Sequence, residues 1–317
     1  MANGSCLKGE ELLLNHKLMN INYWKPFFLL ITLSVFFACG SDDDEEPNII
    51  IINEDGDNGG TTNSDPASYT SRLEVPRLAT SDGIFISHEA DYGNRKVMNY
   101  CLEFAPSAMH SRWVAFRFDG ITRQQVTSRS NEPFTDDPLL PTNYWIGSNY
   151  FNGYDRGHLC ASADRVWSIE ANVQTFYMTN MSPQLNEFNA DIWANYENKF
   201  RNKCRDATFA DTVYVVKGGT IRSGQTMGNV VRSNNMVVRV PKYYFMAFLR
   251  YRYGTYDAIG LWLEHRGYTS AERSNLSANL VTIDQLEELT GIDFFHNLPN
   301  TTEQQVEATY NKTLWGF

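Results

Sequence analysis

The sequence lacks an apolar run long enough to make a membrane-spanning helix. Such a helix needs about 20 consecutive apolar residues, whereas the main apolar stretch runs only from Pro26 to Ala38. Lys25 precedes this stretch, and a small residue ends it directly before Cys39. A short apolar core with a weakly basic start is typical of a signal peptide that is removed on export.

The end of this stretch, Ser-Val-Phe-Phe-Ala-Cys-Gly over residues 34–40, resembles a bacterial lipoprotein cleavage box, with Phe36 where Leu is commonest. This interpretation predicts a signal peptide over residues 1–38, with Met19 as a candidate start, and a lipidated Cys39 at the mature N-terminus. An ordinary signal peptide with an incidental cysteine is the alternative. We expect an exported outer-membrane lipoprotein, held by its lipid at the cell surface of a Gram-negative bacterium.

Lys and Arg are absent between Gly40 and Asp65, where nine acidic residues occur. This segment carries −9 of the formal net charge of −10, so the rest of the chain is nearly neutral. The overall acidity therefore does not exclude a local basic groove for nucleic acid. We expect residues 39–70 to form an acidic, disordered linker after the lipidated cysteine.

Cysteine is scarce, with five in 317 residues, and none stands in a Cys-x-x-Cys or Cys/His zinc pattern. Because an exported protein permits disulfides, we predict a bridge between Cys160 and Cys204. That bridge would pin a predicted helix against the segment that carries His158. Cys101 is expected to be a free, buried thiol.

The chain also has no internal repeat and no second linker, which predicts one folded domain over residues 71–317. Strands are predicted at residues 112–118, 212–216, 236–240, 243–251 and 258–263, and helices at 189–204, 282–290 and 302–310. Residues 123–152 are expected to form a long loop. The fold class is α/β in the α+β sense, with a mixed, largely antiparallel sheet and packed helices.

Groups suited to acid–base and phosphate chemistry gather in residues 154–197. His158 can take a proton from water because its ordinary pKa is near neutrality, and Arg156 can grip a phosphate with its forked guanidinium. Asn189 offers an amide oxygen to a hard cation such as Mg²⁺, which keeps several of its waters. Glu197, two helical turns beyond, can address the same side of the helix. The stretch predicts a one-metal phosphodiesterase site.

Each of these residues also has a purely structural interpretation. His158 could be a solvated or structural histidine, and Arg156 a salt-bridge partner. Asn189 could be a helix N-cap, Glu197 a surface acid, and Asn180 a turn residue. Only the combination of these residues favours a catalytic site.

The combined pattern resembles the DNA/RNA non-specific endonuclease family. The signature of that family is Asp-Arg-Gly-His, then Thr/Ser-Asn-x-x-Pro-Gln, then a metal-binding Asn and a helical Trp-x-x-x-Glu. Here these are residues 155–158, 179–184, 189 and 193–197. The resemblance extends over residues 71–317 and implies a ββα-metal (His-Me) finger active site.

The resemblance implies that His158 is the general base and Asn189 the direct ligand of Mg²⁺, for which Mn²⁺ could substitute. Glu197 would hold water of the metal's hydration shell. Arg156 and Asn180 would support the phosphate and the geometry of the site. An upstream Arg that stabilises the transition state is assigned to Arg129.

This sequence departs from the pattern of the family at two points. Arg123 competes with Arg129 because the intervening loop differs in length. Phe176 stands at a position that is polar in some family members.

The implied activity is hydrolysis of DNA and RNA to 5′-phosphate products, and a homodimer is the oligomer considered. Such an enzyme grips backbone phosphates and needs no base-reading motif. Two alternatives remain: an inactive surface lipoprotein that only binds nucleic acid, and a glycan-binding lipoprotein that uses its aromatic residues.

Overall fold

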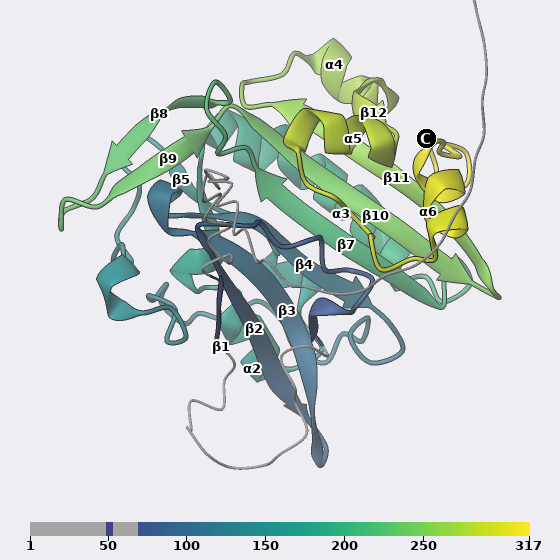
Figure 1. Ribbon diagram of the computed structural model, residues 1–317, viewed down its shortest axis with the longest axis horizontal. Coiled ribbons are helices and arrows are strands. Elements are labelled where there is room, and N and C mark those ends of the chain that lie inside the picture. The colour runs from purple at the N-terminus through teal and green to yellow at the C-terminus, as the bar shows by residue number, and fades with distance from the viewer. Residues whose placement is uncertain (1–48, 53–68) are drawn as a thin grey trace, which may run out of the picture. The chain divides into compact units, whose positions relative to one another are not determined.

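The structure is a computed structural model that describes residues 49–52 and 69–317. Its centre is an eight-stranded sheet in the order β1-β2-β3-β4-β7-β10-β11-β12 (Figure 1). β1 and β2 are parallel, and the other neighbouring strands in this sheet are antiparallel. The predicted mixed, largely antiparallel sheet is confirmed. Its strands are β1 (Ile49–Ile52), β2 (Gly83–Tyr92), β3 (Arg95–Ala105), β4 (His110–Phe118), β7 (Thr212–Gly219), β10 (Tyr243–Arg252), β11 (Thr255–Glu264) and β12 (Leu280–Val281).

Strand β1 corrects the predicted linker, because it lies within residues 39–70. Its sequence is four consecutive isoleucines, which favour strands. The polar residues on both sides dominate the composition of residues 39–70, so this short apolar run does not stand out in the sequence. The predicted signal peptide and Cys39 lie outside the described residues.

Strands β2 and β3 were not predicted, although they pair along most of their length. The last eight residues of β3 are all buried. A strand covered on both faces loses the alternation of apolar and polar residues by which strands are recognised in a sequence.

Each face of the sheet has its own apolar core, and β10 contributes to both. Alternate residues of β10 point into opposite cores, with Tyr244, Met246 and Phe248 in one and Phe245, Ala247 and Leu249 in the other. The first core contains Tyr196 and Phe200 of α3 (Ala194–Arg205), and the second contains Ile283 and Leu286 of α5 (Ile283–Thr290). Figure 1 views the sheet from the side of α5 and α6 (Asn300–Glu307), with α3 behind it.

Three predicted helices are present, with shifted ends. As predicted, the capping box of Thr282 begins α5, and Gly291 in the left-handed conformation ends it. By contrast, α6 begins two residues before the predicted Thr302 and has no side-chain cap. Two short helices were not predicted, α2 (Ile169–Gln174) and α4 (Ser270–Ser274). No helix in residues 49–52 and 69–317 is long and apolar enough to cross a membrane.

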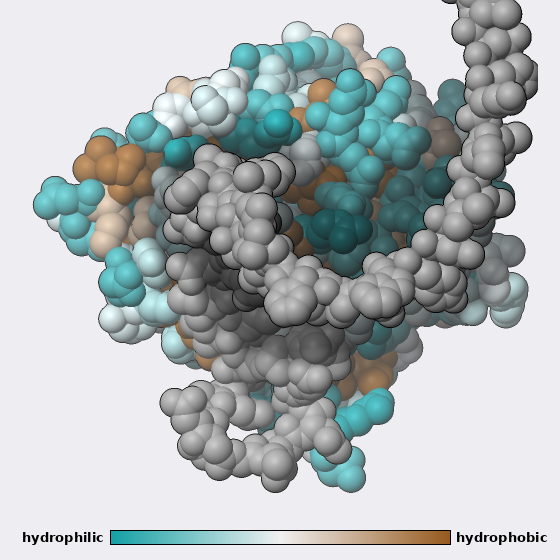
Figure 2. All heavy atoms as spheres, in the orientation of Figure 1, coloured by the Kyte–Doolittle hydropathy of each residue, from teal (hydrophilic) through white to brown (hydrophobic). Residues whose placement is uncertain are grey.

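Two small hairpins stand outside the main sheet. One pairs β5 (Asp155–His158) with β6 (Met181–Gln184), and it leads into a π-helical segment (Phe188–Trp193) and then α3. The other pairs β8 (Thr226–Val231) with β9 (Val237–Pro241). Exposed Met227, Val231 and Val237 make the second hairpin apolar, and Figure 2 shows brown side chains there.

Candidate active site

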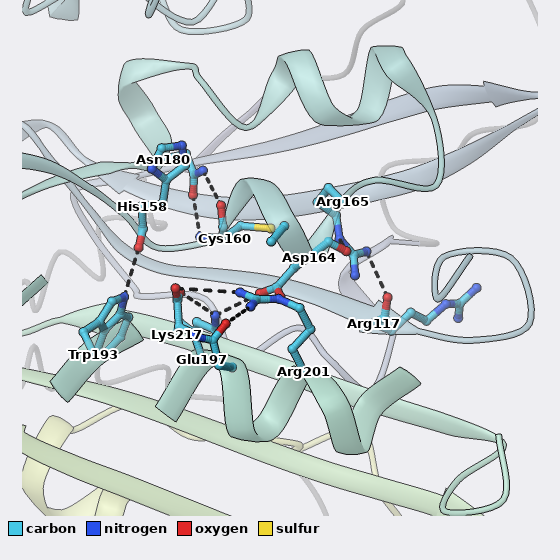
Figure 3. Close-up of polar contacts among 12 residues, drawn as sticks. Arg117, His158, Cys160, Asp164, Arg165, Asn180, Trp193, Glu197, Arg201 and Lys217 are labelled. Carbon is cyan, nitrogen blue, oxygen red and sulfur yellow. Dashed lines mark hydrogen bonds and ion pairs between the residues drawn. The ribbon is translucent and has the colours of Figure 1, made fainter. Parts of the chain in front are cut away.

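The β5–β6 hairpin is fastened to the following helix at both ends of β5. At the first residue of β5, the Asp155 carboxylate accepts a hydrogen bond from Asn189 Nδ2 at 3.0 Å. At the last residue, the His158 carbonyl accepts a hydrogen bond from Trp193 Nε1 at 3.3 Å (Figure 3). Asn189 and Trp193 are four residues apart, so they lie on neighbouring turns of one helical segment. The two strands and the helix therefore form one ββα unit.

Gly157 is required by the way the two strands approach each other. A Cβ atom at this position would lie 2.0 Å from Oε1 of the buried Gln184 side chain. Any larger residue would push the hairpin apart and displace the neighbouring His158. The glycine of the Asp-Arg-Gly-His motif thus has a packing role.

The His158 ring is half-buried between two aromatic rings. Its centroid lies 5.7 Å from that of Phe134 and 5.4 Å from that of Phe176. Burial, followed by the positive charges of Arg129 and Lys217, lowers the pKa of His158 to about 3. Nε2 is buried and has no hydrogen-bond partner among the described residues. The His158 ring is therefore neutral, and no described group engages its Nε2.

Asn180 acts on the backbone that follows His158. Its Oδ1 accepts a hydrogen bond from the Cys160 amide at 2.8 Å, and its Nδ2 donates to the carbonyls of Cys160 and Thr175. The residue is fully buried. These bonds occupy the whole amide, so Asn180 positions the end of β5 and offers no polar atom to a phosphate.

Arg129 and Arg156 supply positive charge near His158, since both lower its pKa. Arg129 is exposed, and its guanidinium carbon lies 4.8 Å from the Phe176 ring centroid. Arg156 stacks on Phe134 at 3.7 Å and donates from Nη1 to the Ser148 carbonyl at 2.6 Å. The aromatic Phe176, which departs from the family pattern, thus supports an arginine by a cation–π contact.

Arg123, the alternative to Arg129, forms hydrogen bonds with the backbone of other segments. Its guanidinium donates to the carbonyl oxygens of Asp119 at 2.8 Å and Ala210 at 2.9 Å. The cations that lower the pKa of His158 most are Arg129, Lys217 and Arg156. The geometry therefore favours Arg129.

Glu197 belongs to a buried ion network that the sequence did not predict (Figure 3). Lys217 Nζ donates to Glu197 Oε1 and to Asp164 Oδ2, both at 3.0 Å. Arg201 Nε donates to the other oxygen of Asp164 at 2.5 Å. The charges of two carboxylates, Asp164 and Glu197, are therefore balanced by two cations, Lys217 and Arg201. Burial raises the pKa of Glu197, although Lys217 opposes this shift.

The position of Lys217 in the sequence could have indicated that it is buried and paired. It has the same parity in β7 as Val213 and Val215, whose side chains lie in the core beneath α3. A lysine at an apolar position of a central strand needs a buried anion. The position of Lys217 in the sequence does not show which acidic residue is its partner.

The residues fit a hard divalent cation. Because Asp155 holds the nitrogen of the Asn189 amide, the carbonyl oxygen is left as the atom for a metal. Such a cation accepts neutral amide oxygens and keeps several waters. In the part of the chain that the structure describes, no cluster of three acidic, His or Cys side chains surrounds this position. A metal here would depend on Asn189 and on water.

The predicted disulfide between Cys160 and Cys204 is wrong, because both are free, buried thiols in the structure, as is Cys101. Both pack in the apolar core under α3. Burial raises the pKa of the Cys160 thiol to about 12 and that of Cys204 further. Side-chain packing, rather than a covalent link, holds α3 here.

Comparisons with known proteins agree with this geometry. A sequence model of the family described as DNA/RNA non-specific endonuclease matches residues 83–301. A nuclease of Nostoc sp. is 30% identical over 227 residues, which cover 66% of this chain and 75% of that protein. The mitochondrial endonuclease G of Bos taurus is 28% identical over 213 residues, with 63% and 68% covered.

A solved structure extends the likeness to the fold. The endonuclease in the crystal structure of the EndoG/EndoGI complex superposes with a TM-score of 0.57 at 17% identity. The match covers 76% of this chain and 96% of that chain. On the family match over most of its folded part, this chain belongs to the DNA/RNA non-specific endonuclease family.

Proposed function

We propose that this protein hydrolyses phosphodiester bonds of both DNA and RNA with Mg²⁺, for which Mn²⁺ can substitute. The observation that carries the proposal is the arrangement of the ββα unit. One end of β5 fixes the amide of Asn189, and the other end presents a neutral, unpartnered His158 Nε2. A base and a metal ligand are thus held by one rigid unit, as hydrolysis of a phosphodiester requires.

In the proposed reaction, His158 Nε2 takes a proton from a water molecule as the water oxygen attacks phosphorus. The bond between phosphorus and the 3′ oxygen breaks, the 3′ oxygen takes a proton from solvent water to become a hydroxyl, and the phosphate stays on the 5′ side. Arg129 and Arg156 face the developing negative charge on the phosphoryl oxygens. Asn189 would hold the Mg²⁺, which would supply positive charge that stabilises the transition state.

Sugar-independent recognition follows from the groups available. The arginines address phosphate oxygens, which DNA and RNA share, and such contacts carry no sequence information. Exposed Tyr150, whose ring centroid lies 4.1 Å from the Arg156 guanidinium carbon, offers a flat surface beside the phosphate groups. Glu197, tied to Lys217, is proposed to hold water near the metal.

The test is digestion of supercoiled plasmid and of total RNA with Mg²⁺ or with EDTA. We expect both substrates to be cut only with the metal, and cutting to be lost in His158→Ala and Asn189→Ala. His296→Ala and Asn202→Ala are matched controls, because these side chains are partly or fully exposed and lie outside the proposed chemistry. A folded wild-type protein that binds but does not cut nucleic acid with Mg²⁺ or Mn²⁺ would support the inactive-binder alternative instead.

The cellular location is a separate proposal that depends on the N-terminal sequence. We infer that Cys39 carries a lipid and that the protein is an outer-membrane lipoprotein at the cell surface. Replacement Cys39→Ser should release the nuclease from the membrane fraction, and continued membrane association would contradict the lipid anchor. A homodimer in solution is proposed as well, and a monomeric mass by light scattering would reject it.

A further inference from the structure

Two helices bring three carboxyl groups together on the face of the sheet opposite α3. Asp284 and Glu287 belong to α5, and Glu307 is the last residue of α6. One carboxylate oxygen of each lies within 4.8 Å of the other two. Figure 1 shows both helices on this face, and Figure 2 shows a hydrophilic surface over α5. The cluster is separate from the ββα unit.

Glu307 distinguishes this cluster from an ordinary group of surface acids. It is only 4% exposed, and its buried Oε1 has no hydrogen-bond partner among the described residues. A buried carboxylate without a compensating partner is costly, so such a group needs a cation or a proton.

Within the described residues, no basic side chain pairs with the buried Oε1 of Glu307. In the described part of the chain, the strongest charge interactions of Glu307 are with other carboxylates, namely Glu287, Glu303, Asp284 and Asp293. The nearby Arg77 pairs with Asp293 at 2.6 Å instead. The neutralising group must therefore come from solution.

We propose that Asp284, Glu287 and Glu307 bind a Ca²⁺ ion, which links α5 to α6. Calcium takes six to eight oxygen ligands at about 2.3–2.6 Å in flexible geometry, so three carboxylates whose oxygens lie within 4.8 Å of one another can surround it. Mg²⁺, with bonds of about 2.0–2.1 Å, demands near-ideal octahedral geometry and usually keeps several waters, so a cluster of three carboxylates favours Ca²⁺. Asp284 is exposed and leaves the outer side of the ion open to water.

Glu287 is already oriented for this role. Its Oε1 accepts a hydrogen bond from the Phe294 amide at 2.7 Å. Such bonds fix the orientation of carboxylates that hold metals. The cluster thus combines a fixed ligand, a buried ligand and an exposed one.

The rival neutralising group is a proton. Burial and the neighbouring carboxylates raise the pKa of Glu307 to about 9 and that of Glu287 to about 7. A proton would remove one charge and could be shared between two of the carboxyl groups, but its binding needs no added metal. Calcium binding and protonation therefore predict different responses to added Ca²⁺.

The experiment uses the purified protein with Asn189→Ala, which removes the proposed catalytic metal ligand. Calcium binding is measured by calorimetric titration at pH 7.5, and stability by thermal unfolding. We expect one Ca²⁺ per chain. At a Ca²⁺ concentration a hundredfold above the Kd, the Tm should rise by about 5–10 °C.

Variants in the same background locate the site. Glu307→Gln and Glu287→Gln should each abolish the Tm rise, whereas Glu288→Gln should keep it, since Glu288 is an exposed residue of α5 outside the cluster. If Glu307→Gln does not fold, Glu287→Gln and Asp284→Asn decide. No Ca²⁺ binding, binding that survives these substitutions, or a response to Mg²⁺ alone would overturn the proposal.

Discussion

Asp155 accepts a hydrogen bond from Asn189 Nδ2 at 3.0 Å, and this bond determines which atom of the amide faces a metal. A carboxylate accepts hydrogen bonds only, so Asp155 can hold nitrogen but not the carbonyl oxygen. The first residue of the Asp-Arg-Gly-His motif is thereby a positioning residue for a side chain 34 residues later.

Replacement Asp155→Asn should raise the Mg²⁺ concentration needed for half-maximal activity by about 10- to 100-fold. The new amide can donate to Asn189 and turn its oxygen away from the metal. Activity is measured as a function of Mg²⁺ concentration on one plasmid substrate. Asn186→Ala is the control, because Asn186 donates to the same Asp155 oxygen at 2.9 Å but is exposed. An equal effect of both variants would contradict the role given to Asn189.

The acid limb of kcat/KM should lie well below pH 6.5. A general base works above its pKa, and the pKa of His158 in the free protein is lowered to about 3. Removal of a positive charge with Arg129→Ala should move the acid limb to higher pH, whereas Lys312→Ala should not move it. An acid limb near 6.5 in the wild type would show that His158 is more solvated than in this structure.

Replacement Lys217→Met should destabilise the fold by about 3–5 kcal/mol, because it leaves two largely buried acids, Glu197 and Asp164, with Arg201 as their remaining cation. Thermal and urea unfolding measure this loss. Exposed Lys312→Met should change stability by less than about 0.5 kcal/mol. Adding Glu197→Gln to Lys217→Met should restore part of the stability, and strictly additive losses would argue against a shared network.

Cys160 and Cys204 should react with a thiol reagent only after unfolding. Both are fully buried, and burial raises the pKa of each thiol, so little thiolate is present at neutral pH. Peptide mapping after labelling with and without urea checks this. Recovery of a Cys160–Cys204 disulfide peptide without reducing agent would contradict the structure.

Several elements were predictable because their signals are local. The capping box at Thr282 and the glycine at 291 define α5 through bonds within a few residues. By contrast, β2 and β3 escaped prediction, because their burial on two faces depends on what packs against them. The free thiols at Cys160 and Cys204 also depend on the three-dimensional packing that surrounds them.

The sequence by itself determined the family, the ββα motif and the candidate residues His158 and Asn189, because those residues stand at fixed spacing along one stretch. Only the tertiary structure decided their partners. The Lys217 network, the stacking of Arg129 on Phe176 and the acidic cluster at Glu307 each join residues from separate segments. Such contacts arise because a buried charge must be neutralised by groups that lie close to it in the folded structure. Spacing along the chain does not determine which groups those are.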